Sequence, residues 1–184
     1  MSKKKAPPRR LDFEVDKLTN SIENTLTGES VETEVIRLGS EDATILSNLE
    51  WQFDWHKEFQ KPRREVHALA AKKNPSVWHG LVSATDEPDH LFMHLIESAP
   101  FNKGHDKLFD GVMGNLVAFL CMNSFEKGHS GNVVFDSKTR LIEHYEKMLG
   151  AQHITHSRLF IGTQAASILV KQYFPNFEHD RNRL

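Results

Sequence analysis

The chain has very little cysteine and no long apolar run, and each shortage argues against a class of protein. Its single cysteine, Cys121, cannot form an internal disulfide, which argues against a disulfide-stapled secreted scaffold. No stretch approaches the ~18 consecutive apolar residues of a membrane span. The five basic residues within positions 1–10 are not followed by an apolar stretch, so a secretory signal of the usual design is not expected either. The sequence therefore predicts a cytoplasmic protein without a membrane partner.

Basic residues are scarce beyond the first ten positions. Residues 1–10 hold five of the 23 lysines and arginines and no acidic residue, which leaves 18 basic against 25 acidic residues in the rest of the chain. An acidic body is not typical of a nucleic-acid-binding protein. The basic, proline-containing segment 1–10 is predicted to be a disordered tail. We accordingly expect no nucleic-acid partner.

Metal ligands at a usable spacing are also lacking, although the chain contains 11 histidines. Only His153 and His156 come close to ligand spacing, and side chains three residues apart on a strand diverge. The sequence has neither a cysteine pair nor an HExxH helix. Cys121 lies within an apolar stretch, where a thiolate nucleophile is disfavoured. Neither a metal site nor cysteine chemistry is predicted.

What the sequence does contain is an ordered series of strand and helix patterns. Strands joined by short turns come first, and the second half alternates helix and strand. Because a strand, a helix and a second strand form a crossover unit, parallel neighbours are expected, with ligands at the carboxyl ends of the strands. The predicted fold is α/β, a mixed sheet with helices packed on it, in one domain over 11–176 followed by a tail over 177–184. The predicted strands are Val31–Leu38, Glu65–Ala71, Val77–Thr85, His90–Ser98, Asn132–Phe135 and His153–Ile161. The predicted helices are one capped by Ser40 with Ile45, Leu46 and Leu49 on one side, then Leu116–Phe125, 141–150 and a last helix from Thr163 to Pro175.

Four aromatic residues follow one another closely in the first third of the chain: Trp51, Phe53, Trp55 and Phe59. Aromatic residues at this density usually belong to a core, and they can also line a pocket. A third alternative is an interface through which the chain forms a homodimer. The sequence leaves these alternatives open.

The segment Leu141–Ala151, LIEHYEKMLGA, resembles a helix of the GNAT superfamily of acyl-CoA-dependent N-acetyltransferases, where the pattern is roughly A-x-x-x-Y-x-K-x-G-F. The order of elements over 30–174 is similar as well, and the motif similarity lies within 89–151. The chain as a whole resembles bacterial proteins of that superfamily. The resemblance implies a GNAT-like central mixed sheet with helices on both faces. It also implies that acetyl-CoA is the cosubstrate and that an amine, in a small molecule or a peptide, accepts the acetyl group.

The resemblance assigns a cofactor-binding role to the turn before the predicted helix. In the family, backbone N–H groups at this helix start bind the CoA pyrophosphate, because a helix N-terminus offers unpaired donors and the positive end of a dipole. The residues at the matching positions are Gly111, Val112, Met113, Gly114 and Asn115.

The turn departs from the family pattern Gln/Arg-x-x-Gly-x-Gly/Ala. Its glycines, Gly111 and Gly114, are three residues apart rather than two, and Asp110 brings a negative charge close to the expected phosphates. Lys138 stands where the family often has asparagine. The alternative interpretation is that the glycines only shape a turn. The corresponding alternative function is a catalytically inactive GNAT-like binding or regulatory module.

The resemblance also implies catalytic roles. Tyr145 matches the family tyrosine that protonates the departing thiolate, and its alternative role is as part of the core face of its helix. Glu97 is the best candidate for the base that takes the proton of the amine, with His94 second. By alternation along the strand these two point to opposite faces unless a bulge intervenes. Backbone N–H groups from Ile96 to Ser98 are expected to polarise the acyl carbonyl.

Overall fold

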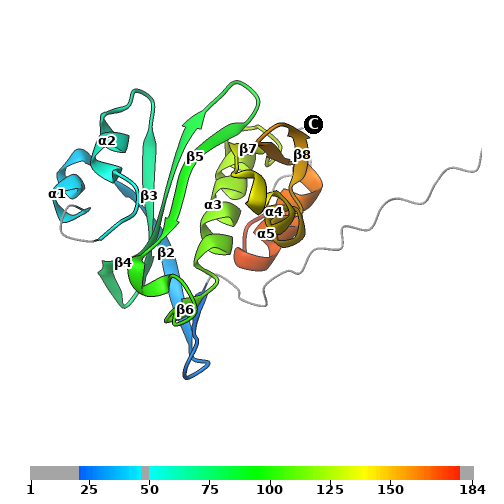
Figure 1. Ribbon diagram of the computed structural model, residues 1–184. Coiled ribbons are helices and arrows are strands. Elements are labelled where there is room, and N and C mark those ends of the chain that lie inside the picture. Colours follow the sequence, from blue (N-terminus) through cyan, green and yellow to red (C-terminus); the bar gives the residue numbers. More distant parts are fainter. Residues whose placement is uncertain (1–20, 47–49, 179–184) are drawn as a thin grey trace, which may run out of the picture.

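The computed structural model describes residues 21–46 and 50–178, which form one mixed sheet with helices on both of its faces (Figure 1). The predicted tail 1–10 lies outside the described residues. Strand bounds are β1 Ser21–Asn24, β2 Ser30–Leu38, β3 Glu65–Ala71, β4 Asn74–Asp86, β5 Leu91–Ser98, β6 Phe109–Asp110, β7 Val133–Asp136, β8 Gln152–Thr155 and β9 Arg158–Ile161. Helix bounds are α1 Ala43–Leu46, α2 Trp55–Gln60, α3 Val112–Glu126, α4 Ile142–Leu149 and α5 Thr163–Tyr173, with single 3₁₀ turns at Ser40–Asp42 (η1), Pro100–Asn102 (η2) and Thr139–Leu141 (η3).

The strand order of the sheet is β6-β1-β2-β3-β4-β5-β7-β9-β8. Neighbouring strands are antiparallel except β5 and β7, which are parallel and are joined through α3. This confirms the crossover unit predicted from the sequence, and it confirms the α/β fold class. On one side of the parallel pair lies a larger antiparallel part of the sheet, and on the other lies the β9–β8 hairpin.

Two separate clusters of buried side chains hold the helices on the two faces. The face covered by α3 and α5 carries the larger cluster, which includes Leu116, Leu120 and Leu169. α3 is apolar nearly all round because it packs between the sheet on one side and α5 on the other. On the opposite face α1 and α2 cover a smaller cluster that includes Trp55 and Trp78. Burying these faces supplies the main stabilisation of the fold.

The aromatic cluster of the first third belongs largely to this smaller core. Trp55 is only 2% exposed, and Trp51 packs edge-on against it with ring centroids 6.4 Å apart. Phe59 is partly buried against the same cluster, whereas Phe53 is 37% exposed. Of the alternatives left open by the sequence, the core interpretation fits these positions.

The structure differs from the predicted elements at α2, which was not expected, and at several strands. The single strand expected over His153–Ile161 is a hairpin of β8 and β9, which turns at His156 with a positive φ of 46°. The short strands β1 and β6 pair with each other, with Glu23 opposite Asp110, and neither was expected. β1 lies in a segment without a clear period, and β6 is only two residues long, so its pairing depends on contacts far apart in the sequence.

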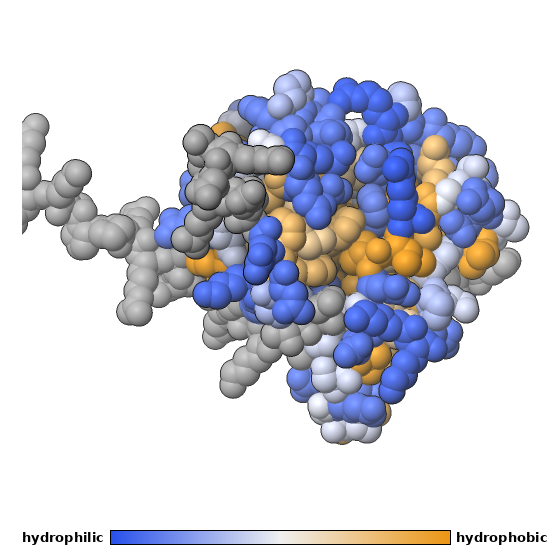
Figure 2. Space-filling model, turned by 180° about the vertical axis from the view of Figure 1, so that it is seen from behind, coloured by the Kyte–Doolittle hydropathy of each residue, from blue (hydrophilic) through white to orange (hydrophobic). Residues whose placement is uncertain are grey.

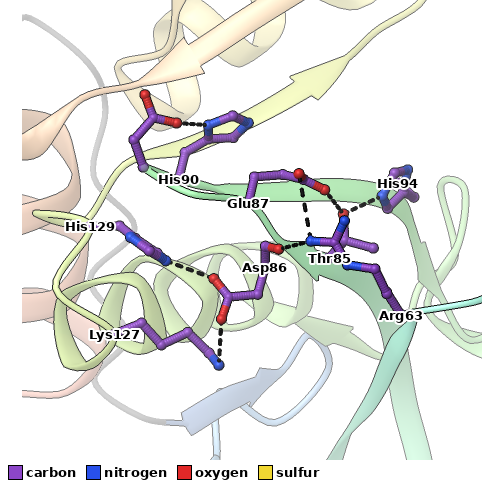
Figure 3. Close-up of polar contacts among 9 residues, drawn as sticks. Arg63, Thr85, Asp86, Glu87, His90, His94, Lys127 and His129 are labelled. Carbon is purple, nitrogen blue, oxygen red and sulfur yellow. Dashed lines mark hydrogen bonds and ion pairs between the residues drawn. The ribbon is translucent and has the colours of Figure 1, made fainter.

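Polar contacts tie the β4–β5 turn to the end of α3, as Figure 3 shows. The Asp86 carboxylate lies 2.6 Å from Nε2 of His129 and 3.1 Å from Nζ of Lys127. Arg63 reaches the backbone carbonyl of Asp86 from the segment before β3. This cluster fixes the closed end of the β4–β5 hairpin against the helix.

The surface seen from behind carries hydrophobic residues toward its middle, with hydrophilic residues around them (Figure 2). In the described residues no helix is both long and apolar enough to span a membrane.

Candidate active site

The two parallel strands pair over a short distance and then part. β5 and β7 are in register only from Leu91↔Val133 to Met93↔Phe135, although β5 continues to Ser98. The second half of β5 therefore has β4 on one edge and no described strand on the other.

The free edge of β5 presents backbone donors. The N–H of Ala99 donates to the carbonyl of His79 in β4 at 2.8 Å. Because alternate residues of a strand direct their backbone groups to opposite edges, the N–H groups of Ile96 and Ser98 point away from β4. They face the side where β7 has diverged.

A cavity of about 340 Å³ opens beside this edge. Met93, Ile96 and Ser98 line it from β5, and residues at the start of α3 form another wall. The remaining walls come from the β5–α3 linker, from α4 and from the end of α5. Lining residues from these parts are Asn102, Lys107, Phe109, Asp110, Gly111, Val112, Met113, Gly114, Val117, Leu141, His144, Tyr145, Met148, Leu149 and Tyr173.

The first turn of α3 has backbone donors without helical partners. Gly111 precedes the helix with φ 84° and ψ −3°, a left-handed conformation that favours glycine. The first helical bond is donated by Asn115 to the carbonyl of Gly111, and none of the described side chains caps this end. The N–H groups of Val112, Met113 and Gly114 therefore have no partner further up the helix and lie at the cavity.

The negative charge of Asp110 at this turn is matched by a cation. Lys107 forms an ion pair with the Asp110 carboxylate, and both residues line the cavity. The ion pair with Lys107 therefore reduces the repulsion between Asp110 and a phosphate bound at this turn.

Gly114 has a packing role that the family pattern does not indicate. A Cβ at this position would overlap the hydroxyl and ring of Tyr173. The end of α5 thus packs directly against the first turn of α3, and Tyr173 is only 2% exposed. Gly111 therefore shapes a turn, as the alternative interpretation states, whereas Gly114 lies inside α3 and allows the close contact with Tyr173.

Tyr145 lies in the cavity wall, on α4 opposite the free edge of β5. Its ring packs edge-to-face on Phe135, with centroids 5.3 Å apart, so it also belongs to the core as the alternative proposed. Burial raises the pKa of the Tyr145 phenol. The phenol is therefore protonated at neutral pH and can donate a proton.

Glu97 does not line this cavity. Its carboxylate faces the smaller core, where it accepts from the N–H of Gln52 at 2.6 Å and from Nε1 of Trp55 at 2.8 Å, and pairs with Lys103. Burial acts to raise the pKa of the Glu97 carboxyl, but the bonds from Lys103, Gln52, Trp55 and Phe53 outweigh it and lower that pKa. A carboxylate held ionised in this way is a weak base, so its contacts suit a structural role.

His94 does not line the cavity either. Its Nε2 lies 2.9 Å from the hydroxyl of Thr85, in the polar cluster of the β4–β5 turn (Figure 3). The bulge that would change the alternation is present, because pairing passes from Ser83↔Leu95 to Ala84↔Met93 and skips His94. The structure therefore brings neither candidate base to Tyr145.

Asn115 is fully buried and turned toward β1. Its Nδ2 donates to the carbonyls of Ser21 and Gly111, at 2.8 and 2.9 Å. Of the residues predicted to bind the cofactor, Ile96, Ser98 and the segment 111–114 line the cavity, and Asn115 instead anchors the helix start.

Sequence reasoning missed several residues of the cavity wall: Asn102, Lys107, His144 and Tyr173. His144 precedes Tyr145 in the motif segment, and Lys107 stands three residues before Asp110 at a spacing that favours an ion pair. Asn102 and Tyr173 reach the cavity only through the fold, so no local pattern could have identified them.

No protein-family model matches the sequence, and no curated protein matches it. Similarity to solved structures is clear. The crystal structure of AtaTR bound with AcCoA has a TM-score of 0.55 at 10% identity, over 74% of this chain and 97% of that one. The structure of the AtaT–AtaR complex bound to DNA has a TM-score of 0.56 at 12% identity, over 74% and 98%. Mutant forms of the spermidine/spermine N-acetyltransferase SpeG from Vibrio cholerae give 0.53 at 13% identity, over 74% and 96%.

One expectation from the sequence is wrong in the light of these structures. We excluded nucleic acid as a partner from the acidic balance of the chain, yet the AtaT–AtaR and KacTA structures are complexes with DNA. Net charge averages over one chain, whereas in an assembly the basic surface can belong to another chain. The acidic net charge of this chain therefore does not exclude a nucleic-acid partner.

The element order, the parallel pair that parts beside α3 and the similar structures agree with one another. The chain has the fold of the GNAT acetyltransferases.

Proposed function

We propose that this protein transfers an acetyl group from acetyl-CoA to an amine. The observation that carries the proposal is the cavity beside the part of β5 that has no partner in β7, where residues of β5, the start of α3 and Tyr145 line the same space. Among proteins of this fold, SpeG is a spermidine/spermine N-acetyltransferase, and AtaTR has been crystallised with acetyl-CoA.

The residues present fit such a cosubstrate. The N–H groups of Val112, Met113 and Gly114, which have no helical partner, suit a pyrophosphate, and Lys107 offsets the negative charge of Asp110 on the same side. The apolar walls, which include Met93 and Leu149, suit the thioester end. Bound acetyl-CoA supplies an acyl group activated as a thioester.

The chain contributes polarisation and a proton. The N–H groups of Ile96 and Ser98 lie where they can donate to the acyl carbonyl oxygen, as oxyanion donors do. The amine nitrogen forms a bond to the carbonyl carbon while the carbon–sulfur bond breaks, and Tyr145 gives its proton to the sulfur. The amine loses its proton to water, because Glu97 faces the other side of the sheet.

The second candidate is a GNAT-like binding module without catalysis. It is favoured by the charges of the cavity wall, where the carboxylate of Asp110 is paired with Lys107 and no other carboxylate lines the cavity among the described residues. Such a protein would bind CoA and leave every amine unmodified.

Calorimetric titration of the purified protein with acetyl-CoA and with CoA at moderate salt tests the proposal. Micromolar binding of both supports the cosubstrate site, and thiol release in the presence of an amine panel then separates the enzyme from the binding module. A folded protein that binds neither ligand up to millimolar concentration contradicts both.

A further inference from the structure

One side of α4 forms a wall of the cavity. The lining residues of this helix and of its N-cap are spaced three and four apart: Leu141, His144, Tyr145, Met148 and Leu149. Side chains at this spacing lie on the same side of a helix. Glu143 and Lys147, which fall between them, do not line the cavity. His144 therefore belongs to the side of α4 that faces the cavity.

Within this wall His144 lies at the outer margin and Tyr145 lies further in. His144 is exposed, whereas Tyr145 is partly buried and Leu149 is only 6% exposed. The rings of His144 and Tyr145 meet edge-on, with centroids 5.5 Å apart and an interplanar angle of 64°. An imidazole in contact with solvent thus lies beside the proposed proton donor.

His144 is the candidate base that remains in the cavity wall of the described part of the chain. The other titratable side chains that line the cavity are Lys107, Asp110, Tyr145 and Tyr173. Lys107 and Asp110 pair with each other, and Tyr173 is only 2% exposed. The ring nitrogens of His144 have no hydrogen-bond or ion-pair partner among the described residues. A neutral imidazole has a nitrogen lone pair that can take up a proton.

The other titratable groups around α4 lie off the cavity. On the helix and the turn before it they are Arg140, Glu143, Glu146 and Lys147, and on β8, which packs against the helix, His153. None of these side chains lines the cavity. A proton released beside Tyr145 therefore meets His144 before any of them.

In the proposed reaction one proton leaves the amine and another leaves Tyr145. The amine nitrogen loses its proton when it bonds to the acyl carbon, and Tyr145 loses its proton to the sulfur. Neither Glu97 nor His94 lines the cavity, so neither is placed to take up the first proton or to restore the second. A base beside Tyr145 can do both.

We propose that His144 takes up the proton of the acceptor amine through a water molecule and then returns it to the phenolate of Tyr145. The inference rests on the proposed function and completes its proton balance. The proton of the amine ends on Tyr145, the proton of Tyr145 ends on the sulfur of CoA, and both side chains regain their starting states.

Acetyl transfer to spermidine, lysine and a peptide with a free N-terminus, followed as thiol release, tests this inference. For an amine that is acetylated, His144→Gln should lower kcat/KM about 100-fold near about pH 8, as expected for loss of a general base. The ratio of wild-type to variant kcat/KM should shrink as the pH falls toward about 5, because protonated His144 accepts no proton, and ionisation of the amine cancels in this ratio. Imidazole in the buffer should raise the turnover of His144→Ala about tenfold. His105→Gln, at a fully exposed histidine outside the cavity, is the matched control and should behave as the wild type.

The outcomes separate this inference from the proposed function. A His144→Gln protein with kcat/KM within about twofold of the wild type overturns the inference and leaves the proposed function standing. A loss that is equal at every pH and is not relieved by imidazole also overturns it, because the residue would then only support the wall. Calorimetry should give His144→Gln a CoA affinity within about twofold of the wild type, and a larger loss would make His144 a residue that holds the cosubstrate instead. Wild-type protein that binds CoA and acetylates no amine contradicts both the transfer reaction and the inference.

Discussion

Tyr145 is the residue on which the proposed chemistry depends most directly. Tyr145→Phe keeps the ring that packs on Phe135 and removes only the hydroxyl. We expect turnover to fall by about 100-fold or more, as for loss of a general acid, while the affinity for CoA stays within about twofold because the ring remains in place. Steady-state thiol release and calorimetry measure the two quantities. Unchanged turnover would remove the assigned role of Tyr145.

Glu97 offers the opposite case, a carboxylate whose contacts are structural. Glu97→Gln weakens the interactions with Lys103, Gln52 and Trp55, and we expect the free energy of unfolding to drop by about 2–4 kcal/mol. Denaturant titration measures this loss, and the exposed Glu29→Gln serves as the matched control. Turnover per folded molecule should change little. A stable Glu97→Gln protein with turnover reduced by orders of magnitude would instead make Glu97 the base.

At the scale of elements, Gly114 allows the end of α5 to lie close to the first turn of α3. Replacing glycine by alanine inside a helix normally stabilises a protein by about 0.5–1 kcal/mol. At Gly114 we expect the opposite sign, a loss of about 1–3 kcal/mol, because the new methyl group overlaps Tyr173. Denaturant titration gives the sign. The double variant Gly114→Ala/Tyr173→Leu should lose less than the sum of the two single variants, and strict additivity would show that the contact is not the cause.

Local sequence patterns predicted most of the elements and fewer of the contacts between them. The strands Glu65–Ala71 and Leu91–Ser98 and the face of α5 follow from periodicity, which depends only on neighbours in the chain. The hairpin at His156 was missed because its turn contains no glycine, proline, asparagine or aspartate.

In the candidate site, too, some residues could be predicted from local sequence and others depend on contacts of the folded chain. The segment 111–114 and Tyr145, which the motif singled out, line the cavity, whereas the side on which Glu97 lies depends on the bulge at His94. A one-residue bulge leaves no clear mark in a strand pattern, so it had to come from the structure. The amide of Asn102 is oriented by His79 on another strand, which is likewise a contact of the folded chain.

At the scale of the whole molecule, two buried histidines link stability to pH. Burial is the main cause that lowers the pKa of His67 and of His79 from 6.5 to about 4. The unfolded chain takes up protons at these groups near pH 6.5, while the folded protein does so only near pH 4. The free energy of unfolding should therefore fall as the pH is lowered through this window, and it should be insensitive to these groups above it.

Thermal unfolding between pH 7.5 and pH 4.5 measures this dependence. His67→Leu should flatten it, because one of the two groups is removed, and replacing the fully exposed His105 by alanine should leave the slope unchanged. A slope that is the same in all three proteins would mean that His67 does not contribute to it.

The short pairing of β5 with β7 has a mechanical consequence. Within residues 21–46 and 50–178, strand pairing joins the larger part of the sheet to β7, β9 and β8 through three residue pairs only. A cosubstrate that donates to or accepts from the free edge of β5 and packs on α4 would add a second connection between the two parts of the sheet. Amide hydrogens of β7 and β9 should then exchange with deuterated solvent more slowly once CoA is bound, while those of β2 and β3, in the larger part, keep their rates.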